Sequence, residues 1–326
     1  MLRFDDIFID CTKLGRKIPK EKYLQKGKHI IIDQGQNDIA GYSNEEDGIF
    51  SDVPVIIFGD HTRIFKLIKS PFFLGADGTK ILKAKISNMS YDYLYYYLKY
   101  KKIPNTGYNR HFKWLKELTF EIKDFNEQEK ISTVLNKVSK ILKMKKQQLS
   151  ELDRLIKFQF LKMFGDPILN EKNWKNAVWK NILIIKNGKN QKQVENIQGI
   201  YPIYGSGGII GYADEYLCEK NTVIIGRKGN INKPILVKTK FWNVDTAFGL
   251  EPIKKVLNSY FLYYFCIFYN FEKHNKAVTI PSLTKNDLLE IKMPLPPIEL
   301  QNKFANFVKQ VDKSKVTFSN SLILEE

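Results

Sequence analysis

The segment Tyr93-Leu-Tyr-Tyr-Tyr97 returns about 170 residues later as Phe261-Leu-Tyr-Tyr-Phe265, and this repetition is the strongest indication of the fold. Five further blocks return in the same order, with spacings that drift by only a few residues. Each block alone matches a common strand or helix pattern, but six collinear matches predict an internal duplication. The other pairs are Ile39-Ala-Gly-Tyr42 with Ile209-Ile-Gly-Tyr212, Val55-Ile-Ile57 with Val223-Ile-Ile225, Asp77 with Asp245, Glu121-Ile-Lys123 with Glu290-Ile-Lys292, and Gln128-Glu-Lys-Ile131 with Gln301-Asn-Lys-Phe304.

Each copy runs through the same order of elements. Short β-rich segments broken by Gly, Asn and Asp come first, as at 199–211 and 222–237. An aromatic helix follows, at 91–101 or 258–270, and its rings at helical spacing are typical of a core rather than of base stacking. A last strand ending at the Glu-Ile-Lys triplet and a long amphipathic helix complete the copy.

The two closing helices carry apolar residues at alternating steps of four and three, which is typical of a coiled-coil seam. Each seam contains one lysine, Lys145 or Lys315, and a lysine at such a position tends to fix register. The first seam is Ile131, Leu135, Val138, Leu142, Leu149, Leu152 and Ile156, and the second is Phe304, Val308, Val311, Phe318 and Leu322.

Two seams in one chain most simply pair with each other in antiparallel fashion. Pro294, Pro296 and Pro297 end the preceding strand and begin the second helix. The first helix, over 127–163, would span about 55 Å, more than the roughly 34 Å turn of B-DNA. The predicted fold is α+β, with two tandem pseudo-symmetric domains joined by two long antiparallel coiled-coil helices.

Charge and composition bound the function. The 326 residues contain 52 basic and 35 acidic side chains, a net charge of +17, which favours a polyanionic partner such as nucleic acid. A generally basic, lysine-rich protein is the alternative. Cys11, Cys218 and Cys266 lack metal-ligand spacing, and neither a signal peptide nor a membrane-spanning run is present. We expect a cytoplasmic chain with reduced cysteines, no metal site and no membrane association.

Several segments, taken in order with the repeat, resemble the specificity subunits of type I restriction–modification systems over nearly the whole chain. They are Ile57-Phe-Gly-Asp-His-Thr-Arg63, Gly75-Ala-Asp-Gly-Thr79, Asn105-Thr-Gly-Tyr-Asn-Arg-His111, Phe160-Leu-Lys-Met-Phe-Gly-Asp-Pro167 and Leu295-Pro-Pro-Ile-Glu-Leu-Gln301. The resemblance implies target recognition domains at 1–123 and 165–294, each reading half of a split DNA site, with spacer helices at 124–164 and 295–326.

The resemblance also implies the partners. Two methyltransferase (modification) subunits would dock on the spacer and methylate adenine with S-adenosylmethionine, and a restriction subunit using ATP and Mg²⁺ would be a further partner. None of these cofactors is expected in this chain. The sequence departs from the pattern in two places. The first spacer lacks the prolines that open the second, and the second helix is short, which weakens the implied partner surface.

Candidate DNA contacts are basic, amide and hydroxyl residues that interrupt strands beside glycines. Arg63 and Arg227 are the strongest candidates for base contacts, because they follow equivalent Val-Ile-Ile strands at matching places. Arginine is also the residue that most often makes a specific contact with guanine. His61 and His111 are expected to face DNA, and the lysines to hold phosphates. The first-domain candidates are Gln34, Gln36, His61, Thr62, Arg63, Asn105, Arg110 and His111; those of the second are Lys189, Lys192, Ser206, Arg227, Lys228, Asn230 and Thr279.

Catalytic interpretations have less support in the sequence than the DNA-binding one. A methyltransferase would need an Asn/Asp-Pro-Pro-aromatic motif, which is absent, and a P-loop is absent as well. The stronger rival is a metal-dependent nuclease that joins Asp77 to Glu121-Ile-Lys123, or Asp245 to Glu290-Ile-Lys292, around Mg²⁺. Such a triplet also arises from simple alternation at the end of a half-buried strand. A coiled-coil scaffold without nucleic acid would leave the duplicated basic loops unexplained. No catalytic residue is predicted.

Overall fold

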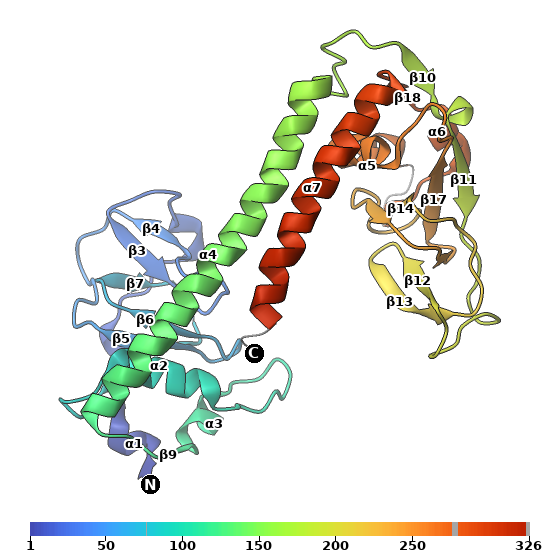
Figure 1. The fold of residues 1–326 in the computed structure, drawn as a ribbon. Helices are drawn as coiled ribbons and strands as arrows, with labels where there is room; N and C mark the ends of the chain where they lie inside the picture. The colour runs from blue at the N-terminus through green and yellow to red at the C-terminus, as the bar shows by residue number, and fades with distance from the viewer. Residues whose placement is uncertain (76, 276–279, 324–326) are drawn as a thin grey trace. The chain divides into compact units, whose positions relative to one another are not determined.

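The computed structural model describes residues 1–75, 77–275 and 280–323, with 317–323 as helix backbone only. The chain divides into two compact units, Met1–Lys143 and Met144–Glu326. The helix α4 (Phe125–Phe164) begins in the first unit and ends in the second (Figure 1). Within the described residues, no helix combines the length and apolar character needed to cross a membrane.

The first unit contains a four-stranded antiparallel sheet in the order β2-β8-β5-β6 and a three-stranded sheet in the order β4-β3-β7. In the smaller sheet β3 is antiparallel to β4 and parallel to β7. The strands are β1 (Leu2–Arg3), β2 (Phe8–Asp10), β3 (His29–Ile32), β4 (Gly41–Ser43), β5 (Val55–Gly59), β6 (Phe65–Ile68), β7 (Phe72–Leu74), β8 (Thr79–Ala84) and β9 (Thr119–Phe120). The helices are α1 (Phe4–Ile7), η1 (Thr12–Leu14), η2 (Lys20–Lys22), α2 (Tyr91–Tyr100) and α3 (Phe112–Lys116).

The aromatic helix α2 covers the larger sheet of the first unit, as the sequence predicts. Tyr93, Leu94 and Leu98 are buried against Ile56 and neighbouring strand residues. The Ser90 hydroxyl caps α2 by accepting a hydrogen bond from the backbone N–H of Tyr93. The β5 strand is buried along its whole length, which explains why its sequence is a continuous apolar run rather than an alternating one.

The second unit repeats the same topology, which confirms the duplication predicted from the sequence. Its larger sheet has the order β11-β17-β14-β15, and its smaller sheet the order β13-β12-β16 with β12 parallel to β16. The strands are β10 (Asn176–Val178), β11 (Leu183–Asn187), β12 (Tyr201–Gly205), β13 (Gly208–Ala213), β14 (Thr222–Gly226), β15 (Ile235–Val237), β16 (Trp242–Asn243), β17 (Ala247–Pro252) and β18 (Lys292–Pro294). The helices are η3 (Trp179–Asn181), α5 (Ser259–Phe268), η4 (Phe271–His274), α6 (Lys285–Leu289) and α7 (Ile298–Ile323).

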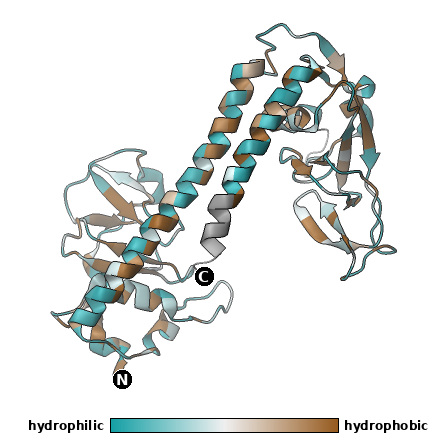
Figure 2. Ribbon diagram, viewed as in Figure 1, coloured by the Kyte–Doolittle hydropathy of each residue, from teal (hydrophilic) through white to brown (hydrophobic). Residues whose placement is uncertain are grey.

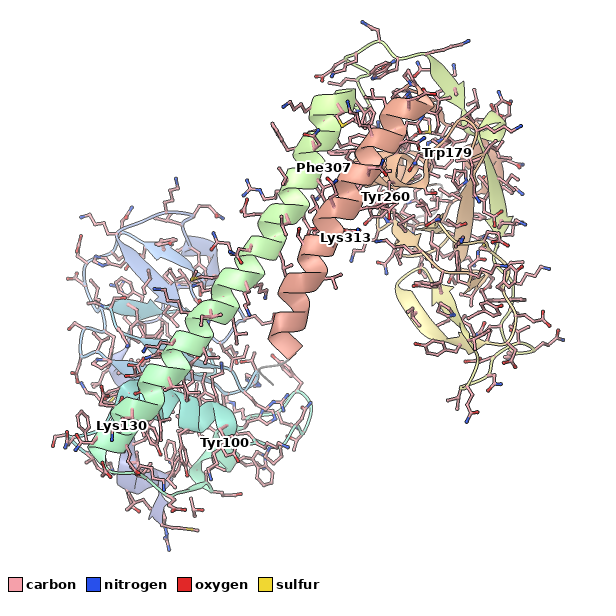
Figure 3. All side chains as sticks on the ribbon, viewed as in Figure 1. Tyr100, Lys130, Trp179, Tyr260, Phe307 and Lys313 are labelled. Carbon is pink, nitrogen blue, oxygen red and sulfur yellow. The ribbon has the colours of Figure 1, made fainter. Side chains whose placement is uncertain are left out.

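The core of the second unit is aromatic and centres on Phe160, near the end of α4. This fully buried ring lies 5.5 Å from the ring of Phe261 on α5 and 5.4 Å from that of Phe304 on α7. Trp179 is also fully buried in this core, and Tyr260 lies beside α7 (Figure 3). The end of α4 therefore packs with α5 and α7 as part of the domain, not only as a spacer.

Both long helices are amphipathic, with apolar and polar residues on different faces (Figure 2). Of the predicted seam, Ile156, Phe304, Val308 and Val311 are buried, and Leu135, Leu149 and Leu152 are half-buried. Ile131, Val138 and Leu142 are 38%, 37% and 41% exposed, so they are not buried as core seam residues would be. Phe318 and Leu322 lie outside the residues whose side chains are described.

Both seam lysines, Lys145 on α4 and Lys315 on α7, are half-buried. Lys315 on α7 lies 2.5 Å from the carboxylate of Asp153 on α4 and 3.8 Å from that of Asp312. An ion pair at this position links the two helices within the second unit and favours one register of α7 along α4.

The predicted last strand of each copy is wrong in detail. In the first copy β9 ends at Phe120, before Glu121. In the second copy Glu290 caps the end of the short helix α6, and β18 begins at Lys292, where pairing with Val178 starts. Alternation alone could not place these ends, because the partner strands β1 and β10 are distant in sequence and set where pairing begins.

Candidate nucleic-acid interface

In the first unit, Gln34 joins three loops that follow strands β3, β5 and β7. Its Oε1 accepts a hydrogen bond from the backbone N–H of His61 at 3.1 Å, and its Nε2 donates to the carbonyl oxygen of Asp77 at 2.9 Å. The Thr62 hydroxyl donates to the carbonyl oxygen of Gln34 at 2.7 Å. The candidates Gln34, His61 and Thr62 are therefore brought together, and the Gln34 amide positions the loops.

The ring of His61 stacks on the ring of Tyr108, with centroids 4.9 Å apart and planes 12° apart. Tyr108 is 88% exposed, and it belongs to the loop that also carries the exposed candidates Asn105 and Arg110. The Lys17 ammonium, which hydrogen-bonds Asp77, and the Arg110 guanidinium lower the pKa of the Asp77 carboxyl. Sequence reasoning missed Tyr108, although it lies inside the Asn105–His111 segment.

His111 does not face DNA, so that prediction is wrong. The residue is fully buried, its backbone N–H donates to the carbonyl oxygen of Asp60 at 2.8 Å, and its Nδ1 lies 3.0 Å from the same oxygen. The Asp60 carboxylate in turn accepts a hydrogen bond from the backbone N–H of Phe112 at 2.7 Å. His111 thus fixes the start of α3 to the end of β5, which is a structural role.

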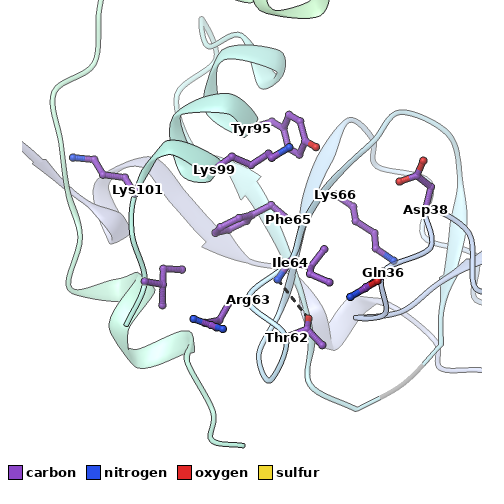
Figure 4. A pocket seen from close by; sticks show the side chains of 11 residues that line it. Gln36, Asp38, Thr62, Arg63, Ile64, Phe65, Lys66, Tyr95, Lys99 and Lys101 are labelled. Atoms are coloured by element: carbon purple, nitrogen blue, oxygen red, sulfur yellow. Dashed lines mark hydrogen bonds between the residues drawn. The ribbon is translucent and has the colours of Figure 1, made fainter. Parts of the chain in front are cut away.

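Arg63 and Gln36 line a concave pocket of about 530 Å³ together with Thr62 and three lysines (Figure 4). We call it the basic pocket, and its basic side chains are Arg63, Lys66, Lys99 and Lys101. Lys66 is only 5% exposed; its ammonium donates to the carbonyl oxygen of Asn37 and lies 3.7 Å from the Asp33 carboxylate. Burial lowers the pKa of Lys66.

In the second unit, Arg227 directly follows β14 and is held on several sides. Its backbone N–H donates to the carbonyl oxygen of Thr246 at 2.8 Å, and its guanidinium lies 5.8 Å from the centre of the Phe248 ring. Its Nη1 donates a long hydrogen bond, 3.5 Å, to the carbonyl oxygen of Asp245. The guanidinium is therefore positioned beside a loop rather than in a carboxylate pair.

The loop after Arg227 meets the β12–β13 turn, which brings Ser206 and Asn230 together. A Cβ placed on Gly207 would lie 3.5 Å from Nδ2 of Asn230, and one on Gly229 would lie 4.0 Å from Oγ of Ser206. A Cβ on Gly226 would lie 2.6 Å from the Asn230 carbonyl oxygen, so the tight turn requires glycine there.

Lys189 and Lys192 are exposed on the loop that follows β11. The backbone N–H of Lys189 donates to the carbonyl oxygen of Asn243 at 2.9 Å, and the indole N–H of Trp242 donates to the Lys189 carbonyl oxygen at 3.0 Å. A Cβ on Gly188 would lie 1.8 Å from the Val244 carbonyl oxygen, so the close approach of the loop to the strand end demands glycine. Lys228 is likewise exposed, and Thr279 lies outside the described residues.

Arg63 and Arg227 do not occupy matching places, contrary to the sequence-based expectation. Arg227 immediately follows Gly226, the last residue of β14, whereas Arg63 lies four residues beyond Gly59, in the turn that joins β5 and β6. The extra residues, starting with Asp60, form the turn to which His111 is bonded. The two arginines therefore belong to differently built loops.

The nuclease interpretation gains no support from the placement of its residues. Asp77 pairs with Lys17, and Glu290 forms an ion pair with Lys180 at 3.0 Å. Over residues 1–75, 77–275 and 280–323, no group of three or more His, Cys, Asp and Glu side chains could hold a metal ion. Asp77 and Glu290 lie instead in ordinary surface ion pairs.

Comparison with solved structures identifies the class of fold. A crystal structure of the type I restriction–modification S subunit from M. genitalium aligns with a TM-score of 0.66 at 21% identity, covering 98% of this chain and 91% of that chain. A chain from a structural study of complex assembly and conformational transition of the type I restriction–modification system aligns with a TM-score of 0.51 at 12% identity, covering 98% and 91%. The predicted α+β fold, with two tandem domains and long helices, is confirmed.

Sequence comparison then shows which proteins the chain is similar to. Residues 171–325 match the family model described as type I restriction modification DNA specificity domain. A curated relative from Methanocaldococcus jannaschii, described as a type I restriction enzyme MjaX specificity subunit, is 23% identical, with 94% of this chain and 78% of the relative covered. Residues 171–325 are therefore similar to the DNA specificity domain family, and the predicted resemblance of the chain to type I specificity subunits, which are non-catalytic, is confirmed.

Proposed function

We propose that this chain selects the DNA site of a type I restriction–modification enzyme by reading a bipartite sequence, one half with each unit. The observation that carries the proposal is the duplicated α+β unit in which the strand-end loops bear basic and amide side chains in both copies. Because the candidate residues of the two copies differ, the two half-sites should differ in sequence.

The charge of the chain supports a polyanionic partner. With a net charge of +17, binding should weaken steeply as salt rises, since each neutralised phosphate releases condensed counterions. On this proposal the exposed Lys189, Lys192 and Lys228 hold phosphates, and Arg227 reads a base edge.

The chemistry is assigned to partner subunits. We propose that two methyltransferase subunits dock on the spacer helices and methylate adenine with S-adenosylmethionine, and that a restriction subunit which needs ATP and Mg²⁺ joins them. The amphipathic faces of α4 support such docking, because Ile131, Val138 and Leu142 remain partly exposed. The complex would act in the cytoplasm.

Base-resolution mapping of methyladenine tests the proposal. The chain is co-expressed with a type I modification subunit, and host DNA is mapped with and without the chain. The proposal predicts a split motif with an unspecified gap that disappears when the chain is deleted. Unchanged methylation, together with Mg²⁺-dependent cleavage by the purified chain alone, would overturn it in favour of a nuclease.

A further inference from the structure

The basic pocket of the first unit contains more positive charge than its surroundings neutralise. Lys66 is satisfied internally by Asn37 and Asp33. Among the residues that the structure describes, Arg63, Lys99 and Lys101 have no carboxylate within ion-pair distance, while Asp38 is the one acidic residue that lines the pocket. Arg63 and Lys99 therefore bring uncompensated positive charge into one concavity, which favours an anion there, whereas the Lys101 side chain points away from both (Figure 4).

Two of these cations are held in place by aromatic rings. The Lys99 ammonium lies 5.2 Å from the centre of the Tyr95 ring, and the Lys101 ammonium lies 5.1 Å from that of Tyr97. Both rings belong to α2, whose Leu94 and Leu98 are anchored in the core. Tyr95 lines the pocket and Tyr97 does not, so the cation–π contact of Lys99 keeps its ammonium group at the pocket without neutralising its charge.

Arg63 adopts an unfavourable backbone conformation at the pocket. Its φ is +61°, a left-handed value that costs a non-glycine residue about 1 kcal/mol or more. Its Nε is buried and has no hydrogen-bond partner among the residues that the structure describes. Glycine would relieve the backbone strain, so an arginine at this position is best explained by what its side chain binds.

We propose that the basic pocket binds a phosphate of the DNA backbone, and that Arg63 positions the duplex on the first unit rather than reading a base. A phosphodiester carries a full negative charge and several acceptor oxygens, which suit a guanidinium flanked by ammonium groups. A guanine edge offers two acceptors and no full charge, and would leave the charges of Arg63 and Lys99 uncompensated. The inference rests on the proposed function and deepens it.

Arg227 provides the contrast within the same chain. Its guanidinium lies against the Phe248 ring and is hydrogen-bonded to the Asp245 carbonyl oxygen, with Ser206 and Asn230 on the adjoining turns. Ser206 and Asn230 can both donate and accept hydrogen bonds, and Lys228, the residue after Arg227, is exposed. The two arginines therefore have different roles, and substitutions should separate them.

The experiment scans backbone charge and base identity separately. The assembled methyltransferase complex is bound to a duplex that carries the mapped motif, in which one phosphate at a time is replaced by a neutral methylphosphonate. In the wild-type complex, one or two neighbouring replacements in one half-site should weaken binding about tenfold. Arg63→Gln should weaken binding by a similar factor, make those replacements silent, and leave the base preference unchanged. For Arg63→Gln, the slope of the logarithm of the binding constant against the logarithm of the salt concentration should fall in magnitude by about one.

Two further variants serve as a control and as a second test of the pocket. Lys255→Gln removes an exposed charge from the second unit and should change neither the scan nor the slope. If Arg63→Gln folds poorly, Lys99→Gln tests the same pocket from α2 and should silence the same positions. A changed base preference in Arg63→Gln, with the methylphosphonate positions still costing tenfold, would overturn the inference.

A small phosphate compound is the other source of this ligand chemistry. Inorganic pyrophosphate should compete with the duplex at millimolar concentration in the wild-type complex and much less in Arg63→Gln. Tight pyrophosphate binding that leaves duplex binding unaffected would assign the pocket to a free anion and overturn the inference. A separate outcome is that the wild-type complex binds the motif duplex no more tightly than DNA of random sequence. In that case the proposed function itself fails.

Discussion

The side-chain oxygen of Gln301 on α7 accepts a hydrogen bond from the backbone N–H of Asn258, the residue that caps α5, at 2.9 Å. Its Nε2 donates to the carbonyl oxygen of Pro296 at 2.8 Å. The first unit repeats this arrangement, because Gln128 accepts from the N–H of Ser90 at 2.9 Å and donates to the Lys123 carbonyl oxygen at 2.8 Å. A buried glutamine thus joins each long helix to the start of its aromatic helix.

Replacing Gln301 by alanine should destabilise the second unit by about 2–3 kcal/mol. The substitution leaves the N–H of Asn258 and the carbonyl of Pro296 buried without this partner, and each unsatisfied group costs about 1–3 kcal/mol. Urea unfolding followed by circular dichroism measures the effect. Gln310→Ala, at an exposed position of α7, is the control and should cost less than about 0.5 kcal/mol. Equal losses in the two variants would contradict the account.

Phe160→Ala should be among the most damaging core substitutions, at about 3–5 kcal/mol. Its ring contacts rings from α4, α5 and α7, so the cavity would open where three helices meet. Phe158, two residues earlier and 63% exposed, is the matched control, and its alanine variant should be nearly neutral. Thermal unfolding of both variants checks this. A comparable drop in Tm for Phe158→Ala would show that the helix, not the core, had been perturbed.

His111→Ala should weaken DNA binding indirectly, by releasing the loop that carries Asn105 and Tyr108. His111 fixes α3 to Asp60, whereas Tyr108 is stacked on His61 at the surface. Hydrogen exchange should therefore rise across 102–112 in His111→Ala, and remain low in Tyr108→Ala. Unchanged exchange in the His111 variant would show that this histidine does not hold the loop in place.

Native cysteines should resist thiol reagents until the chain unfolds. Burial raises the pKa of the Cys218 thiol to about 12, and Cys266 is fully buried with its pKa raised further. Because the thiolate is the reactive form, both should react slowly at pH 8 and faster when urea unfolds the second unit. A chromogenic disulfide reagent gives the rates. Rapid reaction in the folded chain would mean that the second core opens readily.

The duplication, the aromatic helices and the long amphipathic helices could be predicted because each is a periodic pattern in the sequence. The hydrogen bonds of Gln128 and Gln301 could not, although both glutamines were visible as a repeated block. Their partners, Ser90 and Asn258, are distant along the chain and become neighbours only in the fold.

In the candidate site, too, contacts between residues that are distant in sequence could not be predicted. A loop rich in Gly, Asn and Arg was visible in the sequence, but the burial of His111 depends on a contact with Asp60 from another loop. The basic pocket draws Lys99 and Lys101 from the end of a helix that the sequence assigned to the core. Convergence of side chains from different elements is set by topology, which charge and spacing alone do not specify.

Methyladenine mapping of the Arg227→Ala complex tests the central claim, two independent recognition units, most directly. Loss of one arginine–guanine pair should relax one base position by about 1–3 kcal/mol of discrimination. The account predicts that this change falls in one half-site, while the other half-site and the gap stay as in the wild type. Altered bases in both half-sites, or a changed gap with unchanged bases, would contradict it.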